Sequence, residues 1–260
     1  MKRWRGLLLT AGLMATAAAS LPIQALTLQS PAQRVNLLEL YTSHGCSSCP
    51  PADAWLRGLE SHPGLWRELI PLAFHVDYWD GLGWPDRFAS PAFSQRQRDY
   101  RRGGAIRSVY TPGFVLNGRE WRQWFYRPEL DLKANERVGT LTLELEAGSG
   151  AKLRFEPEPR LAQNDFVAHL AILGFGLSSK IGGGENRGRT LDESFVVLSH
   201  DKSAAGRGEW RFAWPQFSAA ESERLAVVAW LTRPGSTQQV QAVGGSPRAC
   251  GHRKITNPFR

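Results

Sequence analysis

Cys46 and Cys49 are separated by two serines in the run Cys-Ser-Ser-Cys. Two cysteines at this spacing can form a redox-active disulfide, and they can also supply two ligands to a metal ion. A zinc site usually needs a second pair of this kind, whereas this chain has three cysteines in total, the third being Cys250. The spacing therefore favours thiol–disulfide chemistry over a structural zinc site.

The segments around the pair predict a strand, a loop and then a helix. Residues 35–42 are mostly apolar on both faces of the predicted strand, which is typical of a buried central strand. Residues 51–59 read as a helix, and residues 69–76 form a second apolar run, close enough for a right-handed βαβ unit. This order places Cys46 near a helix N-terminus, where backbone N–H groups stabilise a thiolate. We expect Cys46 to be the exposed nucleophile and Cys49 to resolve the mixed disulfide.

Three other ionisable residues lie close to the pair in the sequence. Glu39, in the predicted strand, is either a buried acid that takes the proton of Cys49 or a solvated edge residue. Asp53 is either a second proton relay or, as we favour, an acid that complements the helix dipole. His44 either stabilises the thiolate or is a turn residue without a role. His44, Cys46 and Cys49 together could bind copper(I), which is the main non-enzymatic alternative.

An aromatic and acidic loop, residues 77–86, follows the second predicted strand. Its Tyr78, Trp79 and Trp84 are candidates for a substrate-binding groove at the edge of the sheet. Loops of this composition more often pack over a junction between structural elements, and packing is the interpretation we favour.

Two later signals predict local structure. Ser90 and Pro91 suit the N-cap and first position of a helix over residues 92–102. The pair Asn117-Gly118 is a strong signal for a hairpin turn. The arginines of the predicted helix are interpreted as a solvated face.

The N-terminus predicts export. In residues 1–25, basic residues precede an apolar run and then small residues, the pattern of a signal peptide. The apolar run is shorter than the roughly 20 residues that span a membrane. We therefore expect a periplasmic or secreted protein without a stable membrane span after signal removal, in a compartment where disulfides persist. The formal net charge of +8 could suit nucleic acid, but export argues against that partner.

The second half has a different pattern. From about residue 140, short alternating runs are separated by Gly, Pro and Ser turns, which predicts about seven strands in a small antiparallel sandwich. We expect this domain over residues 138–246 and a first domain over residues 33–137. Residues 247–260 form a basic tail with Cys250, interpreted as a free thiol rather than a partner of Cys46 or of a second chain.

The N-terminal half resembles the thioredoxin fold. Besides the cysteine pair between strand and helix, Thr111-Pro112 precedes a strand and hairpin, where thioredoxin-like proteins place a cis-proline facing the dithiol. The resemblance implies that Pro112 orients the substrate and that Thr111 offers it backbone hydrogen bonds. One departure is that prolines 50 and 51 follow Cys49, and neither has an N–H to donate.

A closer resemblance covers most of the chain after residue 25. The runs "ELYTSHGCSSCPPAD", "HVDYWDGLGWPDRFASPAFSQRQ", "YTPGFVLNG" and "GGGENRGRTL" look like an uncharacterised bacterial family of secreted thioredoxin-like proteins, domain of unknown function 1223. This family has no settled function to carry over.

These observations predict an α/β thioredoxin-like domain followed by an antiparallel β-sandwich-like domain. The expected function is thiol–disulfide exchange, without a cofactor, on exported proteins that carry thiols or disulfides. The alternative is a copper(I)-binding or scaffolding module that uses the same cysteines.

Overall fold

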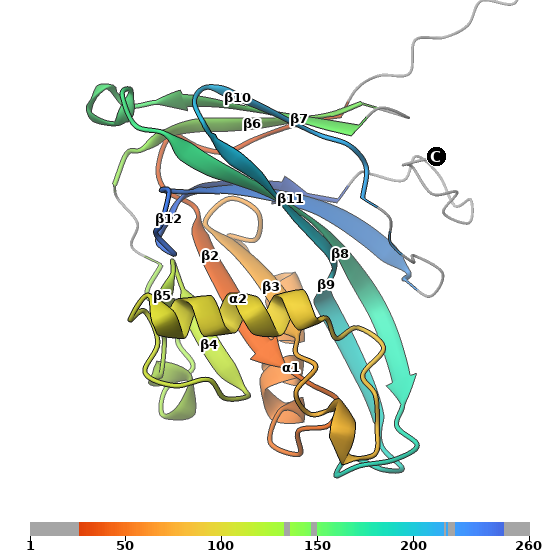
Figure 1. The fold of residues 1–260 in the computed structure, drawn as a ribbon. Coiled ribbons are helices and arrows are strands. Elements are labelled where there is room, and N and C mark those ends of the chain that lie inside the picture. The colour runs from red at the N-terminus through yellow and green to blue at the C-terminus, as the bar shows by residue number, and fades with distance from the viewer. Residues whose placement is uncertain (1–25, 133–135, 147–149, 216, 218–221, 247–260) are drawn as a thin grey trace, which may run out of the picture.

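The computed structural model describes residues 26–132, 136–146, 150–215, 217 and 222–246 of the chain. These residues form two β-sheets and few helices (Figure 1). The predicted signal peptide, residues 1–25, and the basic tail with Cys250 lie outside the described residues. Within the described part, no helix combines the length and the apolar character needed to cross a bilayer.

The larger sheet has eight strands in the order β12-β11-β8-β9-β3-β2-β4-β5. In chain order they are β2 (Asn36–Thr42), β3 (Leu69–His75), β4 (Gly113–Leu116), β5 (Arg119–Glu120), β8 (Phe166–Lys180), β9 (Thr190–Gly206), β11 (Arg224–Thr232) and β12 (Gln239–Gly245). The smaller sheet has the order β1-β6-β7-β10, with β1 (Leu26–Gln29), β6 (Gly139–Glu146), β7 (Gly150–Pro157) and β10 (Glu209–Phe212).

The predicted βαβ unit is present. Strands β2 and β3 are parallel and buried along their whole length, with Thr42 opposite His75 in the register. Helix α1 (Pro50–Gly58) and the 3₁₀ turn η1 (Leu59–Ser61) connect them. The carboxyl ends of both strands therefore lie side by side, and the residues that follow β2 meet the last residue of β3.

The local signals for the second helix and the hairpin are confirmed. Helix α2 (Pro91–Arg102) begins after Ser90, whose Oγ accepts a hydrogen bond from the Ala92 N–H at 3.3 Å. Asn117 and Gly118 both have positive φ, 52° and 81°, and form the turn between the antiparallel strands β4 and β5. Three further 3₁₀ turns are η2 (Asp80–Leu82), η3 (Gln123–Phe125) and η4 (Pro159–Leu161).

The larger sheet crosses the predicted boundary between residues 137 and 138. Strands β8, β9, β11 and β12 come from the second half of the chain and continue the sheet of the first half, since Val196 of β9 pairs with Ala73 of β3. The expectation of a separate antiparallel sandwich in the second half is corrected in this respect. Side chains of the smaller sheet, such as Leu143 and Leu153, share one core with Ile172 and Val227 of the larger sheet.

Three stacked rings come from neighbouring strands of the larger sheet. His169 of β8 stacks on Trp230 of β11 with ring centroids 4.8 Å apart, and His200 of β9 stacks on His169 at 5.3 Å. His169 Nε2 also lies 3.1 Å from the Thr232 hydroxyl. Burial lowers the pKa of His169 well below its usual value of 6.5, and the nearby Arg96 guanidinium adds to the effect.

The buried His169 predicts a loss of stability in acid. As pH falls from 6.5 to about 5, the unfolded His169 gains a proton that the folded residue cannot bind, so the free energy of unfolding falls by up to about 2 kcal/mol. The variant His169→Gln should lose correspondingly less stability over this range. Urea denaturation of both proteins at several pH values checks this difference, and parallel curves for wild type and variant would contradict it.

Candidate active site around the Cys46–Cys49 disulfide

Cys46 and Cys49 form a disulfide, with Cα atoms 5.4 Å apart. The disulfide follows β2 directly, and Cys49 is the N-cap residue of α1. Cys46 Sγ lies 3.3 Å from the Ser48 hydroxyl. The predicted order of strand, cysteine pair and helix is therefore confirmed, and the two sulfurs are within bonding reach.

The start of α1 limits the help that the helix can give to a thiolate. The helix begins at Pro50, and its first two residues are prolines without an N–H. The first N–H of the helix, that of Ala52, donates to the Cys49 carbonyl at 2.8 Å, and the Asp53 N–H donates to the same oxygen at 3.1 Å. Few backbone donors are therefore left to stabilise a charged Cys46, whereas the Ser48 hydroxyl is close to its sulfur.

The prediction that Cys46 is the exposed cysteine is wrong. Cys46 is 1% exposed and Cys49 is fully buried, although Ser47 and Ser48 between them are exposed. Residues 181–189, which connect β8 to β9 and which we call the cap segment, are bonded to the backbone of this loop. The two ends of the cap segment are joined by the Ile181 N–H, which donates to the Arg189 carbonyl at 2.9 Å.

Two side chains of the cap segment hold the cysteine loop. The fully buried Asn186 donates from Nδ2 to the carbonyls of His44 and Cys46, at 2.8 and 2.9 Å. Glu185 accepts a hydrogen bond from the Ser47 N–H at 3.1 Å. Arg189 Nη1 donates to Asn186 Oδ1 at 2.9 Å, which fixes the orientation of the Asn186 amide. The cap segment is therefore bonded to the backbone on both sides of the Cys46 sulfur.

The cap segment also packs on the aromatic loop. A Cβ on Gly183 would lie 2.3 Å from the Gly83 carbonyl oxygen, and a Cβ on Gly182 would lie 2.8 Å from the Trp84 ring. Glycine is thus required at these positions for the close approach of the two loops. Trp84, predicted as a substrate-binding residue, contacts the cap segment instead of lying open.

The aromatic loop connects the cysteine loop to Thr111 and Pro112. Trp79 Nε1 donates to the Thr111 hydroxyl at 2.8 Å, and a Cβ on Gly45 would lie 2.8 Å from Trp79 Cβ. The Thr111–Pro112 peptide bond is cis, as the resemblance implied. Tyr78 is 38% exposed and donates to Gln97. The substrate-binding roles of Tyr78, Trp79 and Trp84 and the substrate-orienting roles of Thr111 and Pro112 stay predictions.

Glu39 is held in an ion pair and is not positioned as a free acid. Its carboxylate accepts two hydrogen bonds from Arg96 of α2, each 2.9 Å long. The hydroxyls of Tyr41 and Tyr100 also donate to it. Since these donors stabilise the charged carboxylate, the structure does not support Glu39 as the group that takes the proton of Cys49.

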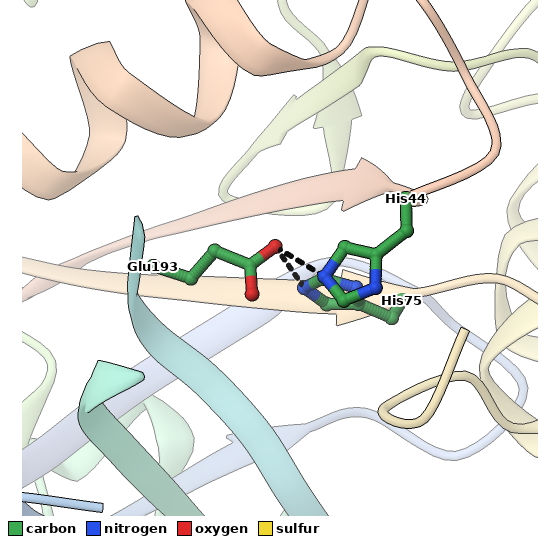
Figure 2. Close-up of side chains that lie close together, drawn as sticks. All are labelled: His44, His75 and Glu193. Atoms are coloured by element: carbon green, nitrogen blue, oxygen red, sulfur yellow. Dashed lines mark hydrogen bonds and ion pairs between the residues drawn. The ribbon is translucent and has the colours of Figure 1, made fainter. Parts of the chain in front are cut away.

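A second polar cluster lies directly behind the cysteine loop. Asp86 accepts the His44 backbone N–H at 2.8 Å and contacts His75 Nδ1 at 2.7 Å. His44 Nε2 lies 2.8 Å from Glu193 Oε1 (Figure 2). The rings of His44 and His75 both pack edge-on against Phe88. The cluster therefore connects the cysteine loop, the end of β3 and β9.

Burial and mutual charge shift the pKa values in this cluster. Burial alone would lower the pKa of His75, but the carboxylates of Asp86 and Glu193 outweigh it and raise the pKa to about 9. Burial alone would raise the pKa of Asp86, but His75 and His44 hold it well below its usual range. Burial raises the pKa of Asp53 to about 7, and the Glu193 charge adds to this shift. Asp53 is thus the acid near the disulfide whose pKa lies near neutrality.

The predicted copper(I) set of His44, Cys46 and Cys49 is not assembled. The cysteines are joined in the disulfide, and the His44 ring nitrogens approach Asp86 and Glu193. Within the residues that the structure describes, the group of three with metal-ligand spacing is His44, His75 and Glu193. Sequence reasoning missed His75 and Glu193. The parallel pairing of the two predicted strands could have indicated His75, but no local signal indicates Glu193.

Comparison with known families gives one family. A family model described as "Protein of unknown function (DUF1223)" matches residues 37–232. This range begins at the second residue of β2 and ends with the last residue of β11, so it includes the cysteine pair, the cap segment and the cluster behind them. No curated protein matches the chain.

Two solved structures are similar. The first is the crystal structure of the protein AGR_C_4864 from Agrobacterium tumefaciens, with a TM-score of 0.60 and 25% identity, covering 85% of this chain and 99% of that chain. The second is HBP35 of Porphyromonas gingivalis, with a TM-score of 0.51 and 13% identity, covering 87% of this chain and 80% of that chain. The second likeness concerns the fold alone.

Proposed function

Since the chain belongs to this family of proteins of unknown function, we propose its activity from the site itself: thiol–disulfide exchange with protein partners through the Cys46–Cys49 disulfide. The observation that carries the proposal is the disulfide at the junction of β2 and α1, at the carboxyl end of a buried parallel strand. The cis Thr111–Pro112 peptide is linked to the same loop through Trp79.

We propose that the fold of residues 33–137 is thioredoxin-like. The parallel β2-α1-β3 unit, the antiparallel β4-β5 hairpin after Pro112 and the position of the disulfide support this assignment. The proposed partners are exported proteins with thiols or disulfides. The exported location rests on the signal-peptide pattern of residues 1–25.

The exchange reaction starts from the oxidised form seen here. A partner thiolate attacks Cys46 Sγ, the bond between the two sulfurs breaks, and Cys49 leaves with the electron pair as a thiolate. A second partner thiol then attacks the mixed disulfide and releases Cys46. The partner dithiol is thereby oxidised to a disulfide, and the protein is reduced by two electrons and takes up two protons. Asp53, one helical turn beyond Cys49, is our candidate for supplying a proton to Cys49.

The buried sulfur implies that exchange is gated by the cap segment. In the closed arrangement, Asn186 and Glu185 hold the backbone of residues 44–47 through three hydrogen bonds. At about 0.5–1.5 kcal/mol each, these three bonds make opening cost about 1.5–4.5 kcal/mol. Such a cost leaves a minor open population through which a partner thiolate can reach Cys46.

The expected result of removing the nucleophile is complete loss of turnover. Wild type should accelerate insulin reduction by dithiothreitol, and Cys46→Ser should give only the uncatalysed rate, because no mixed disulfide with Cys46 can form. The control Cys250→Ser keeps both cysteines of the pair and should retain the wild-type rate.

Two outcomes would refute the proposed activity. One is a Cys46→Ser variant as active as wild type. The other is a wild-type protein that shows no exchange in either direction, in insulin reduction or in oxidative refolding of a reduced substrate, even when the cap segment is loosened. The disulfide would then be structural.

A further inference from the structure

His44, His75 and Glu193 converge from three segments that are distant in the sequence. His44 follows β2, His75 is the last residue of the neighbouring parallel strand β3, and Glu193 lies in β9 (Figure 2). Their side chains are 1%, 1% and 3% exposed. Three ligand-type side chains are thus brought together inside the protein, away from solvent.

Three buried atoms of this cluster lack a hydrogen-bond partner. Among the described residues, they are His44 Nδ1, His75 Nε2 and Glu193 Oε2. Leaving a buried polar atom unpaired costs about 1–3 kcal/mol. His75 Nε2 points toward Glu193 Oε1 at 3.8 Å, which is too long for a hydrogen bond (Figure 2). A cation bound by His75 Nε2 and the Glu193 carboxylate would give both side chains a partner.

The spacing of the three side chains suits a small metal ion. One ligand atom from each residue lies within 4.8 Å of the others. Glu193 Oε1 lies 2.8 Å from His44 Nε2 and 3.8 Å from His75 Nε2. Ligands at about 2.0–2.1 Å in a tetrahedral zinc site lie about 3.3 Å from one another. The two separations from Glu193 Oε1 lie about 0.5 Å to either side of this value, so the three ligand atoms already stand close to the spacing that a bound ion needs.

Asp86 orients His75 for this purpose and also lies close to the His44 ring. Its carboxylate contacts His75 Nδ1 at 2.7 Å and lies 3.2 Å from His44 Nδ1. Metal-ligating histidines commonly present their second ring nitrogen to a carboxylate in this way, which leaves Nε2 for the metal. A divalent ion would bring two positive charges to the carboxylates of Asp86 and Glu193, and its binding would displace the proton from the His75 ring.

We propose that His44, His75 and Glu193 bind one divalent transition-metal ion, with zinc as the first candidate. Two imidazoles and one carboxylate are the ligands of such an ion, whereas calcium and magnesium prefer oxygen ligands. A metal ion there would join the cysteine loop to β3 and β9 and so hold the backbone two residues before Cys46. The site uses no sulfur and is therefore independent of the proposed exchange activity.

Zinc binding can be measured directly on the oxidised protein. We would use the full chain as Cys250→Ser with the disulfide intact, so that no thiol competes for metal, and would titrate the metal-free protein with Zn²⁺ and Co²⁺. The expected result is one equivalent bound, with ligand-field absorption from Co²⁺. Glu193→Gln and His75→Gln should each lower the affinity at least about 100-fold, and Asp86→Asn about 10- to 100-fold.

Asp192→Asn is the matched control. It removes the neighbouring carboxylate on β9, which lies outside the cluster and contacts Ser178 and Arg57, and it should bind zinc like the parent protein. X-ray absorption of the zinc-loaded parent provides a test that needs no ligand variant to fold, with nitrogen and oxygen scatterers expected. The proposal would be overturned by a metal-free protein that binds no zinc, by sulfur ligation, or by unchanged affinity in Glu193→Gln.

Discussion

Arg96→Met should lower the free energy of unfolding by about 3–5 kcal/mol, because it leaves the buried Glu39 carboxylate without its cationic partner. The Glu39 side chain is 1% exposed and has both oxygens bonded to Arg96. Arg96 also lies over the rings of Phe74, Tyr100 and Trp230, at 5.2–5.3 Å from their centroids, so methionine keeps part of this packing. Urea denaturation of wild type and variant measures the loss.

The double variant Glu39→Gln/Arg96→Met separates the charge effect from the packing effect. With the carboxylate neutralised, most of the lost stability should return, because the remaining amide can still bond to the hydroxyls of Tyr41 and Tyr100. A loss below about 1 kcal/mol in the single variant would show that the ion pair is not needed to stabilise Glu39. A double variant as unstable as Arg96→Met would show that packing dominates.

Asn186→Ala should increase the rate at which dithiothreitol reduces the Cys46–Cys49 disulfide by roughly 10- to 100-fold. The substitution removes both hydrogen bonds from the cap segment to the carbonyls of His44 and Cys46. At about 0.5–1.5 kcal/mol each, their loss makes the open arrangement correspondingly more populated. The rate is measured by trapping free thiols with a maleimide at successive times under native conditions.

Asn164→Ala is the control for this experiment. It makes the same chemical change in the turn between η4 and β8, and it should leave the reduction rate unchanged. Denaturation of both variants shows whether a faster reaction reflects global unfolding. An Asn186→Ala protein that is stable and reduced at the wild-type rate would contradict the gating role of the cap segment.

The local parts of the fold could be predicted from the sequence. The order of strand, cysteine pair, helix and strand, the Ser90 cap of α2 and the Asn117-Gly118 turn each depend on residues within a few positions of one another. Such signals are independent of the rest of the chain, and the structure confirms them.

The predictions that failed concern contacts between residues that are far apart in the sequence. The cysteine loop is bonded to Asn186 and Glu185, which lie about 140 positions later, so neither these bonds nor the burial of Cys46 could be predicted from the motif. Glu39 looks like a free acid in its own strand until α2 brings Arg96 to it. The alternating pattern of β9 predicts a strand but not its neighbour, so its pairing with β3 could not be predicted. For the same reason, the contact between Glu193 and His44 could not be predicted from the sequence.

The parallel contact between β3 and β9 has a consequence during synthesis. Val196 leaves the ribosome about 120 residues after Ala73, its partner in the sheet. At a synthesis rate of about 5–20 residues per second, roughly 6–25 s pass between the synthesis of β3 and that of its neighbour β9. During that interval its unpaired N–H and C=O groups can bond to any other extended chain. The β3 edge therefore stays open to such pairing until β9 is in place.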